Sequence, residues 1–210
     1  MLRALGSQPD ALLASRTVRM LRDYNPQDFD AESRALLADI LLNEGMPHRD
    51  QYFLLAGYLK MDDALRSIPA ETITSSKQKR NYGLALLRTG DEAKTQQLLG
   101  NIRQLANGNT FVYDVVPMLV YTRNRDVFDL LIERLLMSDS SCDPPDPHSN
   151  GQIDCGYRLM ESLAPVLKDF PFARSVSGDL DVDDYPAALT EVRAWLRSLG
   201  NNYEIIQDTY

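Results

Sequence analysis

Apolar residues along most of this 210-residue chain recur at intervals of three and four positions, the spacing that places them on one face of an α-helix. The clearest stripe lies near the carboxyl end and consists of Leu189, Val192, Trp195, Leu196 and Leu199. Asp183 and Asp184 precede it as candidate N-caps, Pro186 suits the first turn, and Gly200 suits the end. We predict a helix over residues 186–199 that buries this stripe, including the only tryptophan.

The same spacing predicts further helices upstream, each bounded by residues that interrupt helical backbone, such as Asn-Pro and Thr-Gly-Asp. They cover approximately residues 11–24, 31–42, 52–65, 84–87, 98–105, 127–135 and 153–168. No segment shows sustained alternation of apolar and polar residues, so we expect almost no β-strand. The predicted fold class is therefore all-α.

The predicted helices follow one another in pairs, with a short turn inside each pair and a longer link between pairs. Turns near Gly45, Gly90 and Arg125 lie 45 and 35 residues apart. Pro117 stands within one apolar helical segment, and Pro165 stands at a similar point of another, 48 residues later. Because a proline inside a helix bends it, we expect the bend to belong to the repeat.

The repeat length and these prolines resemble HEAT repeats, whose first helix is often kinked. The segment from Leu84 to Ala93 also resembles the turn of a tetratricopeptide unit, although Gly90 and Ala93 are closer together than that family's glycine and alanine. The HEAT-like resemblance covers roughly residues 30–200. It implies a right-handed α-α superhelix, or solenoid, of four to five antiparallel helix pairs, in a single repeat domain over residues 1–210. The chain begins within a helical pattern, which is compatible with a segment of a longer protein.

Two irregular insertions interrupt the helical pattern, near residues 138–152 and 170–184. The only cysteines, Cys142 and Cys155, lie in and just after the first of them. Two interpretations stay open: a local disulfide, which would close a 14-residue loop, or two free structural thiols. A disulfide would place the protein outside the reducing cytosol, whereas free thiols suit the cytoplasm.

Composition is that of a globular protein, with 44% hydrophobic residues and a net charge of −8. Duplex nucleic-acid binding needs a basic face, and residues 77–80 form the only basic cluster. The longest apolar run, residues 115–121, is far shorter than the roughly 20 residues of a membrane span. We therefore expect neither nucleic-acid binding nor a membrane span.

The negative charge is concentrated in one region. Residues 139–184 hold ten acidic residues and three basic ones, a net charge of −7. This region is where a cation or a basic partner is to be sought. Asp179, Asp181 and Asp183 place carboxylates at alternate positions, as at the start of a calcium-binding loop. The resemblance to that loop ends there, because the sixth position holds Asp184 in place of glycine.

The sequence offers few candidate residues for zinc binding or catalysis. Cys142, His148 and Cys155 are three potential zinc ligands, but their spacing lacks the closely paired ligands of structural zinc sites. The only other histidine is His48, and the chain has no nucleophile motif and no phosphate-binding glycine loop. We expect no catalytic residues and no cofactor.

These observations favour a non-enzymatic protein-interaction scaffold that presents a concave helical-repeat surface to a protein or peptide partner. The alternative is a metal-dependent hydrolase or lyase accessory domain that uses calcium or zinc in the acidic region 139–184. The sequence specifies neither the identity of the partner nor an oligomeric state.

Overall fold

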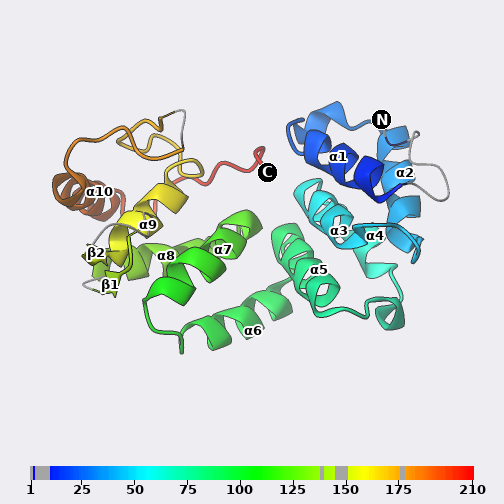
Figure 1. Cartoon of the computed structure of the whole chain (residues 1–210), viewed down its shortest axis with the longest axis horizontal. Coiled ribbons are helices and arrows are strands. Elements are labelled where there is room, and N and C mark those ends of the chain that lie inside the picture. Colours follow the sequence, from blue (N-terminus) through cyan, green and yellow to red (C-terminus); the bar gives the residue numbers. More distant parts are fainter. Residues whose placement is uncertain (1, 3–9, 138–139, 145–150, 176–177) are drawn as a thin grey trace. The chain divides into compact units, whose positions relative to one another are not determined.

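The computed structural model of the chain describes residues 2, 10–137, 140–144, 151–175 and 178–210, which are mostly helical with very little strand, as predicted (Figure 1). The chain forms two compact units. Unit 1 comprises residues 1–95 and 208–210, and unit 2 comprises residues 96–207.

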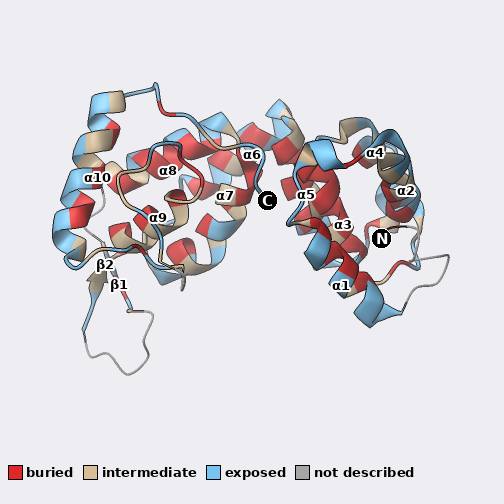
Figure 2. Cartoon of the chain, turned by 90° about the horizontal axis from the view of Figure 1, so that it is seen from above, coloured by how far each residue is buried: buried red, intermediate tan, exposed pale blue. Residues whose placement is uncertain are grey.

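Unit 1 is organised around one central helix. Its elements are α1 (Ala11–Leu21), a 3-10 turn at Pro26–Asp28, α2 (Ala31–Leu42), α3 (Arg49–Tyr58), α4 (Asp62–Arg66), a 3-10 turn at Ala70–Thr72, α5 (Ser76–Thr89) and the start of α6 (Glu92–Ile102). Helix α3 packs on α1, α2, α4 and α5. It is buried over most of its length (Figure 2), which explains why its apolar residues surround the helix instead of forming one stripe.

Side-chain caps set most helix boundaries in this unit. The Asp30 side chain accepts a hydrogen bond from the Ser33 amide at 2.8 Å, so α2 begins where the sequence predicts. Ser75 and Gln78 form a capping box at the start of α5. Gly90 ends α5 with a φ of 103°, a left-handed conformation that glycine adopts without a steric penalty.

The predicted continuous helix over residues 52–65 is wrong, because α3 ends and α4 begins within it. Lys60 adopts a left-handed φ of 56°. The Met61 amide then donates to the carbonyl of Ala56 at 3.0 Å, and the Lys60 amide donates to that of Gly57 at 3.1 Å. This is a Schellman helix end, built on a lysine where a glycine is usual, so the sequence lacked the usual signal for it.

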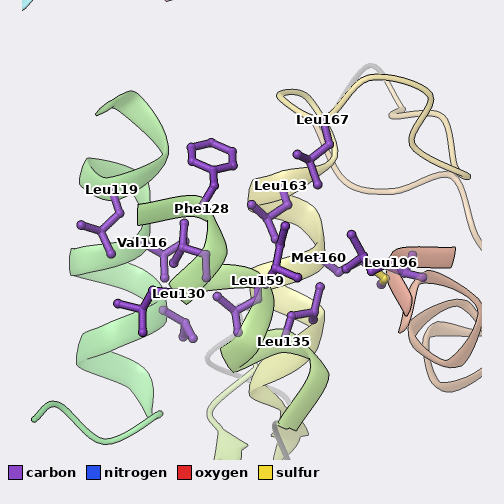
Figure 3. Packing of buried hydrophobic residues seen from close by; sticks show 14 of the residues in the cluster. Val116, Leu119, Phe128, Leu130, Leu135, Leu159, Met160, Leu163, Leu167 and Leu196 are labelled. Carbon is purple, nitrogen blue, oxygen red and sulfur yellow. The ribbon is translucent and has the colours of Figure 1, made fainter. Parts of the chain in front are cut away.

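Unit 2 has its core around α9. Its elements are the rest of α6, a π-helical turn at Thr110–Val115, α7 (Val116–Thr122), α8 (Arg125–Met137), α9 (Cys155–Leu163), α10 (Tyr185–Leu199) and an antiparallel pair of two-residue strands, β1 (Ser141–Cys142) and β2 (Ile153–Asp154). Helix α9 packs on α7, α8 and α10. Figure 3 shows apolar side chains of all four helices meeting in this core, among them Leu119, Phe128, Leu159, Leu163 and Leu196.

The two prolines do not mark equivalent bends. Pro117 lies inside a continuous helical stretch, because the π-helical turn Thr110–Val115 runs directly into α7 and both Val115 and Val116 keep right-handed helical backbone. Pro165 lies beyond Leu163, the last residue of α9, so the predicted helix over residues 153–168 is shorter at both ends. Pro117 therefore stands within a helix, as predicted, whereas Pro165 follows the end of one. The prediction of a repeated mid-helix bend is therefore wrong.

Helix α10 confirms the predicted helix over residues 186–199. Asp184 caps it by accepting from the Ala187 amide at 3.0 Å, and Leu189, Val192 and Leu196 are buried. Trp195 is only partly buried, and its ring meets that of Phe170 edge to face at 5.5 Å. The prediction that this tryptophan is fully buried is wrong.

Candidate functional site

Unit 2 contains a cleft with a volume of about 390 Å³. It is lined by Ile153, Tyr157, Arg158, Glu161, Asp179 and Tyr185. These residues come from β2, from α9, from the insertion at 170–184 and from the first residue of α10. A second cleft of about 420 Å³ shares Arg158, Glu161 and Asp179 with the first, so the two are adjacent.

Helix α9 lines the first cleft with one face and packs into the core of unit 2 with the other. Leu159, Met160 and Leu163 are buried in the core of unit 2. Tyr157 and Glu161, four residues apart, lie together on the half-buried face. The spacing of the apolar residues therefore determines which side chains reach the cleft.

Two contacts fix the start of α9. The Asp154 side chain accepts from the Gly156 amide at 2.7 Å, which caps the helix. Cys155, the first residue of the helix, forms a disulfide with Cys142 of β1, and both cysteines are buried. The hairpin β1–β2 is thereby joined covalently to the helix that carries the cleft.

Polar contacts within the cleft centre on Glu161. Its carboxylate accepts a hydrogen bond from the Tyr185 hydroxyl at 2.8 Å and forms an ion pair with Arg158. The Tyr157 and Tyr185 rings meet edge to face at 5.5 Å. The Arg158 guanidinium also lies 5.2 Å from the centre of the Tyr113 ring. Each oxygen of Glu161 therefore has one partner within the chain.

Burial and these contacts shift the acidity of both tyrosines. Burial, followed by the hydrogen bond to Glu161, raises the pKa of Tyr185 to about 12. Burial, followed by the negative charge of Asp154, also raises the pKa of Tyr157. Both hydroxyls are therefore neutral near pH 7, and the cleft presents them as uncharged aromatic groups.

The three aspartates predicted as metal ligands lie along the insertion at 170–184. The insertion folds back on itself through an antiparallel bridge between Arg174 and Leu180. This fold places Asp179 at the cleft and leaves Asp181 and Asp183 exposed. Within the described parts of the chain, no three His, Cys, Asp or Glu residues are grouped so that they could hold a metal ion.

The other candidate residues are scattered. His148 lies outside the described residues, as does much of the insertion at 138–152. His48 precedes α3 with a left-handed φ of 57° and belongs to unit 1. Lys77, from the basic cluster, forms an ion pair with Asp50 at 3.2 Å. Neither His48 nor Lys77 lines the cleft.

No family model, curated protein or solved structure gives a significant match to this chain. The HEAT-like resemblance therefore stays a prediction. No helix in the described part of the chain combines the length and apolar character needed to cross a membrane.

Sequence reasoning missed the aromatic residues of the cleft. Tyr157 and Glu161 were detectable in principle, because they lie four residues apart and opposite the apolar stripe of α9. Tyr185 directly follows Asp183 and Asp184, which the sequence offers as a candidate metal ligand and as helix caps. No sequence signal pairs Tyr185 with Glu161, since 24 residues and an irregular insertion separate them.

Proposed function

We propose that the chain is a HEAT-like α-solenoid that serves as a non-enzymatic protein-interaction scaffold. Support comes from the packing within each unit, where helices close in sequence are neighbours in space. In unit 1, α3 packs on α2 and α5, and in unit 2, α8 packs on α7 and α9. Packing between successive helices is how repeat arrays build a continuous core and a long recognition surface.

The cleft beside α9 is the observation that carries the proposal. It combines two tyrosine rings, an aliphatic side chain and the exposed carboxylate of Asp179, and the Arg158 cation in its lining is paired with Glu161. Aromatic faces and carboxylates together bind lysine and arginine side chains well, through cation–π and ionic contacts. The segment that supplies most of the lining, residues 139–184, carries a net charge of −7 in sequence. The proposed partner is therefore a protein segment that carries basic residues.

The bonding of Glu161 favours binding over proton transfer. A general base needs a carboxylate oxygen that can reach a substrate proton. In the cleft, Arg158 and Tyr185 each contact one of the Glu161 oxygens.

The buried Cys142–Cys155 disulfide further supports a role in an oxidising compartment, where such a bond persists.

An array of random 12-residue peptides, probed with the labelled full-length chain, tests the proposal. We expect the retained peptides to be enriched in lysine and arginine, with retention that falls as salt rises. Tyr157→Ala and Asp179→Asn should each weaken this retention several-fold. Glu191→Gln, which removes an exposed acid elsewhere on α10, is the matched control and should leave retention unchanged.

Two results would count against this function. Retention of acidic peptides in preference to basic ones would contradict the charge complementarity. Equal retention by wild type and Tyr157→Ala would show that the cleft beside α9 is not the site of binding.

A further inference from the structure

Unit 1 holds a short segment from the far end of the sequence, residues 208–210. The Tyr58 hydroxyl lies 2.8 Å from the carbonyl oxygen of Asp208 and 3.0 Å from that of Tyr24, so these two carbonyls share its single hydrogen. The Arg88 guanidinium donates to the carbonyl of Thr209 at 2.6 Å. Both donors are built into the unit, since Tyr58 is 2% exposed and Arg88 is 1% exposed.

The third residue of the segment is held by its ring. The Arg22 guanidinium lies 4.4 Å from the centre of the Tyr210 ring, within the range of a cation–π contact. The Tyr58 ring meets the Tyr210 ring edge to face at 5.6 Å. Tyr210 packs against the apolar core of unit 1. Burial raises the pKa of Tyr210 to about 12, so its hydroxyl is neutral near pH 7.

The site is cationic in a chain of net negative charge. Arg22 and Arg88 both contact the segment, and the Lys60 ammonium donates to the carbonyl of Arg88. The charges of Arg22 and Arg88 act on the Tyr210 hydroxyl, as does the opposing charge of Asp50. Burying an arginine is unfavourable unless it gains hydrogen bonds or stacking. Arg88 gains both, from the Thr209 carbonyl and from the Tyr58 ring, whose centre is 5.0 Å away.

These contacts define what the site recognises. The first two residues are bound through main-chain carbonyls, which every amino acid provides. The third is bound through an aromatic ring between a guanidinium and a second ring. The ligand class is therefore a short non-helical peptide segment with an aromatic residue in its third position.

We propose that the site formed by Arg22, Tyr58 and Arg88 is a peptide-recognition site, with residues 208–210 as its ligand within the same chain and the same segment of a second copy as its ligand in trans. A second copy is the partner because each copy carries a segment that fits the site. Exchange of an identical element between copies is a common route to dimers. This site is separate from the cleft beside α9, so the proposal does not depend on the function proposed above.

A labelled peptide with the sequence of residues 204–210, acetylated and amidated so that no terminal charge contributes, tests recognition by fluorescence anisotropy. Full-length Tyr210→Ala, whose own segment has lost its ring, should bind this peptide. Wild type should bind it at least ten-fold more weakly, because its own segment competes at a high effective concentration. Adding Arg22→Ala to the Tyr210→Ala chain, or replacing the peptide's tyrosine by alanine, should abolish binding.

Mixing two variants tests exchange between copies. Tyr210→Ala offers an intact site, and Arg22→Ala offers an intact segment. Sedimentation velocity of the equimolar mixture should show a 1:1 complex that neither variant forms alone, and the free peptide should dissolve it. Tyr210→Phe, which keeps the ring, should resemble wild type in both experiments.

Three results would overturn the proposal. The first is that folded Tyr210→Ala does not bind the peptide, and the second is that wild type and Tyr210→Ala bind it equally. The third is that Tyr210→Ala binds the peptide but forms no 1:1 complex with Arg22→Ala. Tyr210→Leu, which keeps apolar volume but no ring, replaces Tyr210→Ala if circular dichroism shows that the alanine variant is unfolded.

Discussion

At the scale of single residues, Gly156 decides how closely α9 approaches α10. A Cβ atom at this position would lie 3.0 Å from Leu189 Cδ2 and 2.9 Å from Asp154 Oδ1. Contacts this short force neighbouring atoms to move, so Gly156→Ala should lower the free energy of unfolding by about 1–3 kcal/mol. Urea unfolding monitored by circular dichroism measures the change.

Gly83 provides the matched control. It lies within α5, and a Cβ there would meet nothing within 4 Å. Gly83→Ala should therefore raise the free energy of unfolding by about 0.5–1 kcal/mol, through the better helix propensity of alanine. Equal effects at the two glycines would contradict the close approach of α9 and α10.

Trp195 contributes less to stability than a fully buried tryptophan would. Its ring packs on Phe170 but stays partly exposed. Trp195→Ala should cost about 1–3 kcal/mol, whereas a fully buried tryptophan would cost about 3–5 kcal/mol. Trp195→Phe, which keeps an aromatic partner for Phe170, should cost less than the alanine variant. A loss above 4 kcal/mol for the alanine variant, measured by denaturant unfolding, would be incompatible with the partial exposure.

The raised pKa of Tyr185 predicts that the folded chain loses stability at high pH. Its pKa is about 12 in the folded chain, above the ordinary value of 10.0, so the folded state holds the phenolic proton more tightly than the unfolded state does. The resulting stabilisation is complete below pH 10 and is lost as the pH rises from 10 through 12. Urea unfolding at pH 9 and pH 11.5 should therefore show a smaller loss for Tyr185→Phe than for wild type. An identical loss in the two chains would argue against the burial of this hydroxyl and its hydrogen bond to Glu161.

Residue-level prediction from sequence succeeded where a side chain acts on its own neighbourhood. Asp184 directly precedes α10 and caps it by accepting from the amide three residues further on, so sequence alone could place that boundary. The helix end at Lys60 could not be placed in this way. Its left-handed backbone is accompanied by long-range contacts, including a hydrogen bond from Arg34 to the Leu59 carbonyl at 2.7 Å.

At the scale of elements, the disulfide connects the hairpin β1–β2 to α9. In the chain-entropy model, a cross-link that closes a loop of this length stabilises by about 3 kcal/mol. Replacing Cys142 and Cys155 together by serine should therefore lower the free energy of unfolding by a similar amount. Thiol titration of wild type under denaturing, non-reducing conditions should detect no reactive thiol, and two reactive thiols would refute the bond.

Helix ranges were predictable from sequence wherever apolar spacing and capping residues agreed, as in α2 and α10. The prediction failed at Pro165, because sequence spacing alone does not distinguish the interior of a helix from the residues just beyond its end. The cleft was predictable only in part. The cleft takes most of its lining from the acidic region 139–184, but its aromatic lining depends on how the insertion at 170–184 brings Tyr185 to Glu161. The alternative metal-dependent function stays a prediction, which a rise in melting temperature with calcium or zinc would support.

At the scale of the whole molecule, the boundary between the units falls inside α6, between Thr95 and Gln96. Linkers between domains are usually exposed and irregular, and they show a change in composition. A boundary within a regular helix has no such signature, which explains why the sequence predicts one domain over residues 1–210.

Native proteolysis tests this boundary. Trypsin prefers exposed, irregular backbone, so it should cut slowly after Lys94, which lies within α6. Mass spectrometry of early digests should therefore show few fragments that begin at Thr95. Rapid cleavage after Lys94 would show that α6 is a flexible linker, and the heat-unfolded chain provides the positive control for cutting.

The assignment of residues 208–210 to unit 1 has a consequence for folding during synthesis. Unit 2 is in effect an insert within unit 1, because the chain leaves unit 1 after residue 95 and returns to it at residue 208. Domains generally fold in the order in which the ribosome makes them. Here the ribosome completes all of unit 2 before it makes the last residues of unit 1. The amino-terminal unit is therefore the last to gain its full set of contacts.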